Sequence, residues 1–274
     1  MIANRGSHFL IIVNASRKLD DFNHLEKQIG DRCQIELLAD RSLLALQGPL
    51  ASKVLENYNS SFARMFFLDV KTITLLGVEC WVSRSGYTGE DGFELSIPSE
   101  DVKRIAEELL AHEDVLPIGL GARDSLRLEA GLCLYGHDLD EITTPIEANL
   151  NWAVHKARRI GGDREGGFIG DQIILGQLAS GADIKRVALL PKERAPIREG
   201  CALFETAEST SRVGHVTSGG FSPTLQKPIS LAYIKSDLAT KNNELFAEVR
   251  GKRMVVTVTT LPFVKTKYKI KTKE

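Results

Sequence analysis

The last third of the chain carries six short apolar runs, each long enough for one β-strand. Turn-forming residues separate these runs, among them residues 198–200, 218–220 and 250–252. Apolar runs of this length and spacing are typical of an antiparallel barrel or sandwich. We therefore predict a separate C-terminal β-barrel domain over residues 176–274. The six runs are 187–190, 201–204, 213–217, 229–234, 245–249 and 254–258.

Before residue 176 the apolar patterns alternate between helical and strand periods, so the predicted fold class is α+β. Residues 9–13 form a continuous apolar run, typical of a strand covered on both faces. Strands are predicted at 9–13, 34–39, 42–46, 71–76, 78–83 and 93–97, with a hairpin turn at Gly77. Helices are predicted at 19–29, ended by Gly30, from Pro49, at 102–110 with Ser99 as cap, and from Arg123 to Gly131.

The composition is that of a soluble globular protein, with 43% hydrophobic and 26% charged residues in 274. A net charge of −1 gives no long-range attraction to nucleic acid or to an anionic membrane. The apolar runs are too short to span a bilayer. Four cysteines lie far apart in the sequence, which favours free thiols in a reducing compartment. They are Cys33, Cys80, Cys133 and Cys201.

The sequence predicts no metal site. Cys133 and His137 are four residues apart, but no second pair accompanies them. Asp138, Asp140 and Glu141 lack the ligand spacing of a calcium loop, so we interpret them as a solvated face. Lysines occupy alternate positions of the C-terminal tail. They indicate either a solvated tail or a basic patch that binds an anionic ligand or partner. They stand at positions 265, 267, 269, 271 and 273.

Residues 84–94 are the stretch most typical of a binding site. Gly86, Gly89 and Gly92 recur at every third position, which allows a tight turn and a close approach of the backbone. The strand that follows directs Glu94 to the face opposite its apolar side chains. Arg123 is a donor whose shape suits a carboxylate. From spacing alone, Glu94 and Arg123 either share a site or are separate surface charges.

Two motifs in this region are long and specific: Gly-Tyr-Thr-Gly-Glu-Asp-Gly-Phe-Glu at 86–94 and Ala-Arg-Asp-Ser-Leu-Arg-Leu-Glu-Ala-Gly-Leu-Cys-Leu-Tyr-Gly-His-Asp-Leu at 122–139. They closely resemble the T-proteins of the glycine cleavage system, a family of aminomethyltransferases. The resemblance runs from the first strand to Tyr268. It implies a folate-binding region over residues 1–175, with interleaved subdomains 37–125 and 1–36 with 126–175.

The resemblance also implies which residues contact tetrahydrofolate. Glu94 would accept the adjacent N–H donors of the pterin, and Arg123 would orient that acid or pair with an anionic part of the folate. For Tyr87 the alternative to contact with the folate is packing in the core. For Trp152 the alternative is a buried structural role. The family β-domain signature at 216–223 is interpreted as a turn. The full set of expected ligand-binding residues is Glu94, Arg123, Tyr268, Tyr87, Asn14 and Trp152.

The expected reaction is transfer of the methylene group of aminomethyl-dihydrolipoyl H-protein to tetrahydrofolate, with release of ammonia. The expected partners are lipoylated H-protein and tetrahydrofolate, the latter as co-substrate, and no metal or redox cofactor is expected. The location would be cytoplasmic in a bacterium and the mitochondrial matrix in a eukaryote.

One family feature is expected to be missing. T-proteins carry an aspartate that orients or deprotonates the folate nucleophile, and counting back from Asn14 places it before Met1. The resemblance therefore implies an N-terminally incomplete chain, either truncated or completed by a partner. A non-catalytic folate-binding paralogue is the alternative function. The same fold also occurs in flavin-dependent dehydrogenases and in iron–sulfur assembly factors, but the sequence has neither the glycine fingerprint of a flavin domain nor the cysteine motif of the assembly factors.

Overall fold

The computed structural model describes residues 1–272, which divide between two compact units. Unit 1 comprises Met1–Ile118 together with the tail that starts at Lys267, and unit 2 comprises Gly119–Thr266. The domain boundary between residues 175 and 176 and the interleaved subdomains stay predictions. No helix within residues 1–272 is both long and apolar enough to cross a bilayer.

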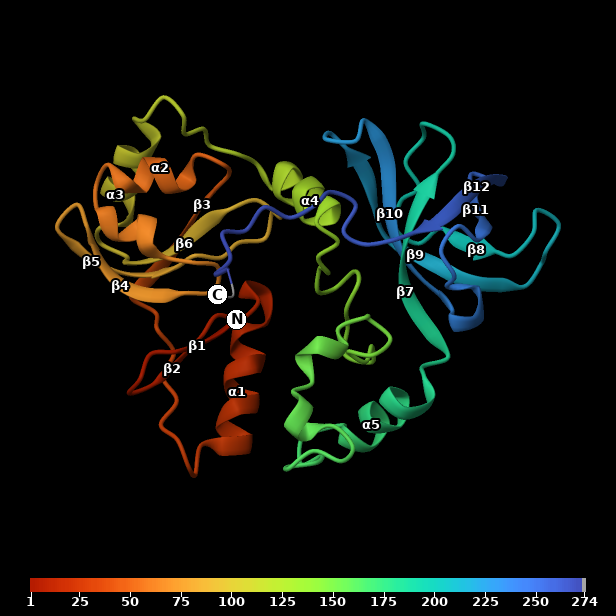
Figure 1. Cartoon of the computed structure of the whole chain (residues 1–274), viewed down its shortest axis with the longest axis horizontal. Coiled ribbons are helices and arrows are strands. Elements are labelled where there is room, and N and C mark those ends of the chain that lie inside the picture. The colour runs from red at the N-terminus through yellow and green to blue at the C-terminus, as the bar shows by residue number, and fades with distance from the viewer. Residues whose placement is uncertain (273–274) are drawn as a thin grey trace. The chain divides into compact units, whose positions relative to one another are not determined.

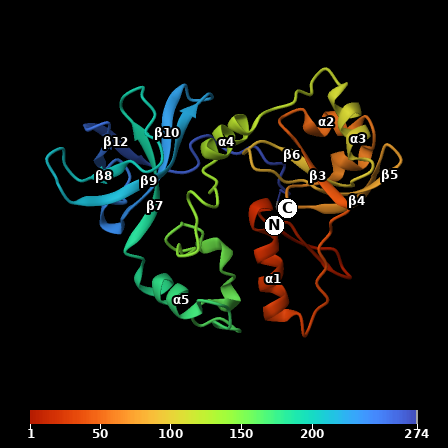
Figure 2. The ribbon, with the colours of Figure 1, turned by 180° about the vertical axis from the view of Figure 1, so that it is seen from behind.

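Unit 1 contains a four-stranded antiparallel sheet in the order β3-β6-β5-β4 and a two-stranded hairpin of β1 and β2 (Figure 1). Its strands are β1 (Ile2–Asn4), β2 (Phe9–Ile11), β3 (Arg41–Gln47), β4 (Val70–Leu75), β5 (Val78–Ser83) and β6 (Gly92–Pro98). Its helices are η1 (Ala15–Arg17), α1 (Lys18–Ile29), α2 (Ala51–Glu56), η2 (Ser60–Arg64) and α3 (Val102–Leu110). Helices α2 and α3 lie on one side of the sheet and the hairpin on the other, in views from front and back (Figures 1 and 2).

The core of unit 1 follows from the period-two pattern of β6. Phe93, Leu95 and Ile97 are fully buried, and they pack in one cluster with α2 and α3. Phe93 meets the ring of Phe62 edge to face, with the ring centroids 5.4 Å apart. The predicted alternation of this strand is therefore confirmed, and it directs Glu94 to the opposite face of the sheet.

Unit 2 is built around a closed antiparallel barrel in the order β10-β7-β12-β11-β8-β9. Each of the six predicted apolar runs coincides with one of its strands, except that Cys201 precedes β8, so the α+β fold class with a C-terminal barrel is confirmed. The strands are β7 (Ile184–Pro191), β8 (Ala202–Phe204), β9 (Arg212–Ser222), β10 (Lys227–Lys235), β11 (Glu244–Val249) and β12 (Lys252–Thr259). The helices are α4 (Leu120–Glu129), η3 (Asn151–Ala153), η4 (Lys156–Arg158), α5 (Asp171–Ser180) and η5 (Ser236–Leu238).

Helix α4 packs on the outside of this barrel through Leu128, which forms a buried cluster with Ile229 and Leu231 of β10. The helix is followed by Gly131, which has a φ of +70°. Glycine adopts this left-handed conformation without steric penalty, so the predicted end of the helix is confirmed.

Three local predictions in unit 1 are wrong. Residues 34–39 form no strand, because Leu37 is exposed and no neighbouring strand pairs with them. The strand predicted at 9–13 is the short β2, and Phe9 is exposed because β2 pairs only with β1. Ser99 does not cap α3, whose N-cap residue is Asp101.

The interpretation of residues 216–223 as a turn is also wrong, because β9 continues through this sequence to Ser222. Gly219 pairs with Ser230, and Gly220 pairs with Ile229. A Cβ on Gly219 would lie 1.8 Å from the carbonyl oxygen of Ile197. The glycine therefore permits a close approach of two backbone segments inside a strand.

Candidate functional site

The loop between β5 and β6 is built around the side chain of Gln47. The Nε2 atom of Gln47 donates to the carbonyl oxygens of Ser85 (3.0 Å) and Phe93 (3.1 Å). A Cβ on Gly86 would lie 1.7 Å from Gln47 Oε1, and one on Gly92 would lie 2.5 Å from Gln47 Cδ. A Cβ at either position would displace the Gln47 carboxamide and break the hydrogen bonds that it makes to the loop.

Arg84 fastens the start of this loop to the turn that precedes β4. Its buried guanidinium pairs with Asp91, with Nε 2.9 Å from Oδ1, and Nη1 donates to the carbonyl oxygen of Met65 at 2.8 Å. Its main-chain N–H donates to Asp69 and its carbonyl accepts from Leu68. Because a buried guanidinium without partners is strongly destabilising, these bonds fix the loop against the turn.

Glu94 follows the loop directly. It lies on β6 across from Ala45 and Ser83, and its carboxylate is half-buried. Ser85 Oγ donates to Glu94 Oε2 at 2.6 Å. Within residues 1–272 the other oxygen, Oε1, accepts no hydrogen bond. Glu94 also lines a small hollow with Trp81 and residues of the β1–β2 hairpin. Ser85 therefore fixes the carboxylate beside this hollow, and Oε1 keeps its capacity to accept a hydrogen bond.

The C-terminal tail lies against the same loop. The Lys267 N–H donates to the carbonyl oxygen of Gly89 at 2.9 Å, and Lys267 Nζ lies 2.5 Å from Glu90 Oε1. The ring of Tyr268 stacks on Phe67, with centroids 4.0 Å apart and an interplanar angle of 7°. The structure thus brings Tyr268 to the loop that ends at Glu94. The lysines at 265, 267, 269 and 271 are exposed, as a solvated tail predicts, although those at 267, 269 and 271 also reach acceptors in unit 1. Lys273 lies outside the described residues.

Two further observations characterise the tyrosines of this site. Burial raises the pKa of Tyr268, so its hydroxyl stays protonated at neutral pH and can donate. This hydroxyl donates to no group within residues 1–272. Tyr87 lies in the loop itself and is partly buried.

The remaining predicted site residues lie elsewhere. Asn14 is exposed in unit 1, and its side chain caps η1 by accepting from the Ser16 N–H at 3.1 Å. Arg123 lies on the exposed part of α4, and Trp152 is 78% exposed in η3, both in unit 2. The hypothesis that Arg123 meets Glu94 stays a prediction, because the two residues belong to different units.

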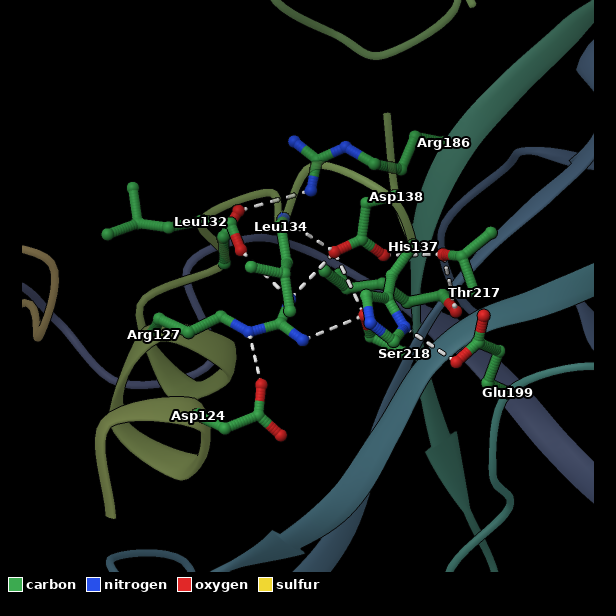
Figure 3. Close-up of polar contacts among 12 residues, drawn as sticks. Asp124, Arg127, Leu132, Leu134, His137, Asp138, Arg186, Glu199, Thr217 and Ser218 are labelled. Atoms are coloured by element: carbon green, nitrogen blue, oxygen red, sulfur yellow. Dashed lines mark hydrogen bonds and ion pairs between the residues drawn. The ribbon is translucent and has the colours of Figure 1, made fainter. Parts of the chain in front are cut away.

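Sequence reasoning missed a buried polar network in unit 2 (Figure 3). Arg127, on α4, donates to Asp138 Oδ2 at 2.7 Å and to Ser218 Oγ at 2.9 Å. Thr217 Oγ1 donates to Asp138 Oδ1 at 2.5 Å. Asp138 was predicted to be solvated, but it is 1% exposed, because donors from α4 and β9 surround it. The sequence signal that could have indicated this network is that Arg127 stands one helical turn after Arg123 on the predicted helix.

Neither the cysteines nor the acidic residues form a metal centre in the described part of the chain. Residues 1–272 contain no group of three or more His, Cys, Asp or Glu that could hold an ion. Burial raises the pKa of the Cys133 thiol, which favours the neutral form. Glu94 and the tyrosines supply hydrogen-bonding groups at the candidate site.

Comparison with known proteins shows which families the chain matches. Residues 1–158 match the family described as the GCVT N-terminal domain, and residues 185–265 match the glycine cleavage T-protein C-terminal barrel domain. A mitochondrial aminomethyltransferase of Dictyostelium discoideum is 41% identical over 98% of this chain and 70% of its own length. The mitochondrial aminomethyltransferase of Pisum sativum is 42% identical over 95% of this chain and 64% of its own length.

A solved structure agrees with these relatives. The crystal structure of the glycine cleavage system aminomethyltransferase T from Bartonella henselae matches with a TM-score of 0.85 and 40% identity, over 95% of this chain and 70% of that one. The chain thus spans about two thirds of the length of the relatives that it matches.

Proposed function

The chain belongs to the glycine cleavage T-protein family, and on this basis we propose that it binds tetrahydrofolate and acts as an aminomethyltransferase. The proposed reaction moves the methylene group from the aminomethyl-dihydrolipoyl arm of H-protein to tetrahydrofolate. Two carbon–nitrogen bonds form between the methylene group and nitrogens of the folate, while the carbon–sulfur bond and the bond to the amino group break. The two folate N–H protons go to the lipoyl thiol and to the departing ammonia. Both substrates are proposals for this chain.

The observation that carries the proposal is the placement of Glu94. Ser85 Oγ donates to its carboxylate at 2.6 Å, at the end of the loop between β5 and β6, which we call the glycine loop. Its other oxygen, Oε1, is available to a ligand in this proposal. A pterin presents a ring N–H and an amino group side by side, and a carboxylate can accept from both. In this proposal the protein orients the two reactants, a contribution worth about 7–11 kcal/mol in well-aligned reactions.

Tyr87, Tyr268, Asn14, Arg123 and Trp152 are proposed as further folate contacts. The proposed cellular partner is the lipoylated H-protein. The names of the relatives place them in mitochondria, which supports a location in the mitochondrial matrix if the chain is eukaryotic. A bacterial chain would be cytoplasmic.

The proposal is tested by titrating tetrahydrofolate into the chain and into Glu94→Gln. Loss of a charged hydrogen-bond acceptor costs about 1.5–3 kcal/mol, so E94Q should raise the Kd by roughly 10- to 150-fold. Glu79→Gln is the matched control, because Glu79 lies exposed on the adjacent strand β5. Ammonia release from aminomethyl H-protein then tests turnover. Binding without turnover would support the non-catalytic alternative, and equal Kd values for E94Q and the parent chain would contradict the role of Glu94.

A further inference from the structure

The C-terminal tail is fastened to unit 1 at every second residue. Its lysines reach acceptors on the η2 helix, on the turn before β4 and on the glycine loop. The three contacts are Lys267 Nζ to Glu90 Oε1 at 2.5 Å, Lys269 Nζ to the Ala63 carbonyl at 2.5 Å, and Lys271 Nζ to Asp69 Oδ1 at 3.4 Å. The tail therefore has a defined path over the elements that carry the loop.

Phe67 contacts this tail twice. Its ring stacks on the ring of Tyr268, and its main-chain N–H donates to the carbonyl oxygen of Lys269 at 2.7 Å. The ring contact and the main-chain bond fall on successive positions of the tail. Together they fix the position and the orientation of the Tyr268 ring relative to Phe67.

The turn that presents Phe67 is itself rigid. Leu68 has a φ of +70° and donates to the Arg84 carbonyl at 2.9 Å. The Phe66 N–H donates to Asp69 Oδ2 at 2.9 Å, and the Asp69 N–H donates back to the Phe66 carbonyl at 2.9 Å. Because Arg84 also begins the glycine loop, Phe67 has a fixed place relative to the strand that carries Glu94.

We propose that Phe67 is a positioning residue of the ligand site, which holds the Tyr268 ring so that its hydroxyl faces the bound ligand. The inference rests on the proposed function, since tetrahydrofolate is the ligand that Tyr268 would contact. The hydroxyl is a half-buried donor with no acceptor within residues 1–272, which a ligand acceptor would satisfy.

The test compares Phe67→Leu with Phe67→Tyr, which keeps the stacked ring, and with Phe221→Leu as the matched control, because Phe221 is exposed on β9 in unit 2. The chain contains five tyrosines, and labelling with 3-fluorotyrosine gives each a ¹⁹F resonance; Tyr268→Phe identifies that of Tyr268. Loss of the ring pair should shift this resonance in F67L and weaken tetrahydrofolate binding by about twofold to tenfold. F67Y should preserve both, and F221L should change neither.

Two results would overturn the proposal: an unshifted Tyr268 resonance in F67L, or a shifted resonance with an unchanged Kd for tetrahydrofolate. If the parent chain does not bind tetrahydrofolate at all, the proposed function and the ligand role of Phe67 both fail. The ¹⁹F measurement still shows in that case whether Phe67 fixes the Tyr268 ring, so the two failures are distinguished.

Discussion

The guanidinium of Arg127 and the carboxylate of Asp138 pair at 2.7 Å, although the side chains are only 3% and 0% exposed. Thr217, Ser218 and the Leu134 N–H complete the hydrogen bonds of the carboxylate. Charged groups this far from water are retained only when all their partners are present. The pair therefore ties α4 to the loop after it and to strand β9.

Removing one member of this pair should destabilise unit 2 strongly. Asp138→Ala removes the buried counter-charge of Arg127 and leaves only Asp124, whose side chain is 56% exposed. The expected loss is about 3–5 kcal/mol in the free energy of unfolding measured with urea. Glu248→Ala is the control, because the Arg253–Glu248 pair is partly exposed and should contribute less than about 1 kcal/mol. A loss below about 1 kcal/mol in D138A would show that the network does not hold α4.

Two adjacent glycines in β9 should respond very differently to the same change. A Cβ on Gly219 would lie 1.8 Å from the carbonyl oxygen of Ile197, which cannot move without the backbone. A Cβ on Gly220 would meet Leu128 Cδ2 at 3.6 Å, an ordinary contact. Gly219→Ala should therefore lower the unfolding free energy by about 1–3 kcal/mol or more, and Gly220→Ala by less than about 1 kcal/mol. Equal effects in urea unfolding would contradict this placement of β9.

The barrel was predictable because a short stretch of sequence is enough to indicate each of its strands. Each strand of unit 2 carries its own apolar run, and each run is bounded by turn-forming residues. The alternation of Phe93, Leu95 and Ile97 likewise gave both the strand and the direction of Glu94. The 218–220 prediction failed because glycine marks close approach as well as turns, and only the partner, Ile197, distinguishes the two.

The site was predictable only in its residue types. Nothing near Gly86 and Gly92 in sequence shows that Gln47 fills the loop, and nothing near Tyr268 shows that Phe67 lies beneath it. Asp138 resembled a solvated acid because its side-chain donors come from residues 11 and about 80 positions away. These contacts depend on tertiary packing, which no local pattern contains.

The four cysteines should differ in reactivity with a thiol reagent such as DTNB. Cys33 is exposed, whereas Cys80 is fully buried and burial raises its pKa, as it does for Cys133. The reactive species is the thiolate, so the native chain should show a fast phase from Cys33. Cys33→Ser should remove that phase, and Cys80→Ser should leave it unchanged. A fast phase that persists in C33S would contradict the exposure of Cys33.

Asp69 should make the anchorage of the tail dependent on pH. Burial alone would raise the pKa of Asp69, but the hydrogen bond from the Phe66 N–H and the charge of Lys271 hold it below the ordinary value. A carboxyl with a lowered folded pKa stabilises the protein above its unfolded pKa of about 4, and this stabilisation is lost as pH falls through the lower folded value.

Asp69→Asn should therefore unfold more easily than the parent chain from neutral pH down to about pH 5, by less than about 1 kcal/mol because the ion pair with Lys271 is partly exposed. The difference should shrink below about pH 4, where the parent carboxylate is itself being protonated. Asp31→Asn is the control, since Asp31 is exposed and its nearest cationic group, Arg32, is exposed as well. Urea unfolding at a series of pH values gives the comparison. A difference between D69N and the parent that grows on acidification would mean that the Asp69 carboxylate does not hold the tail.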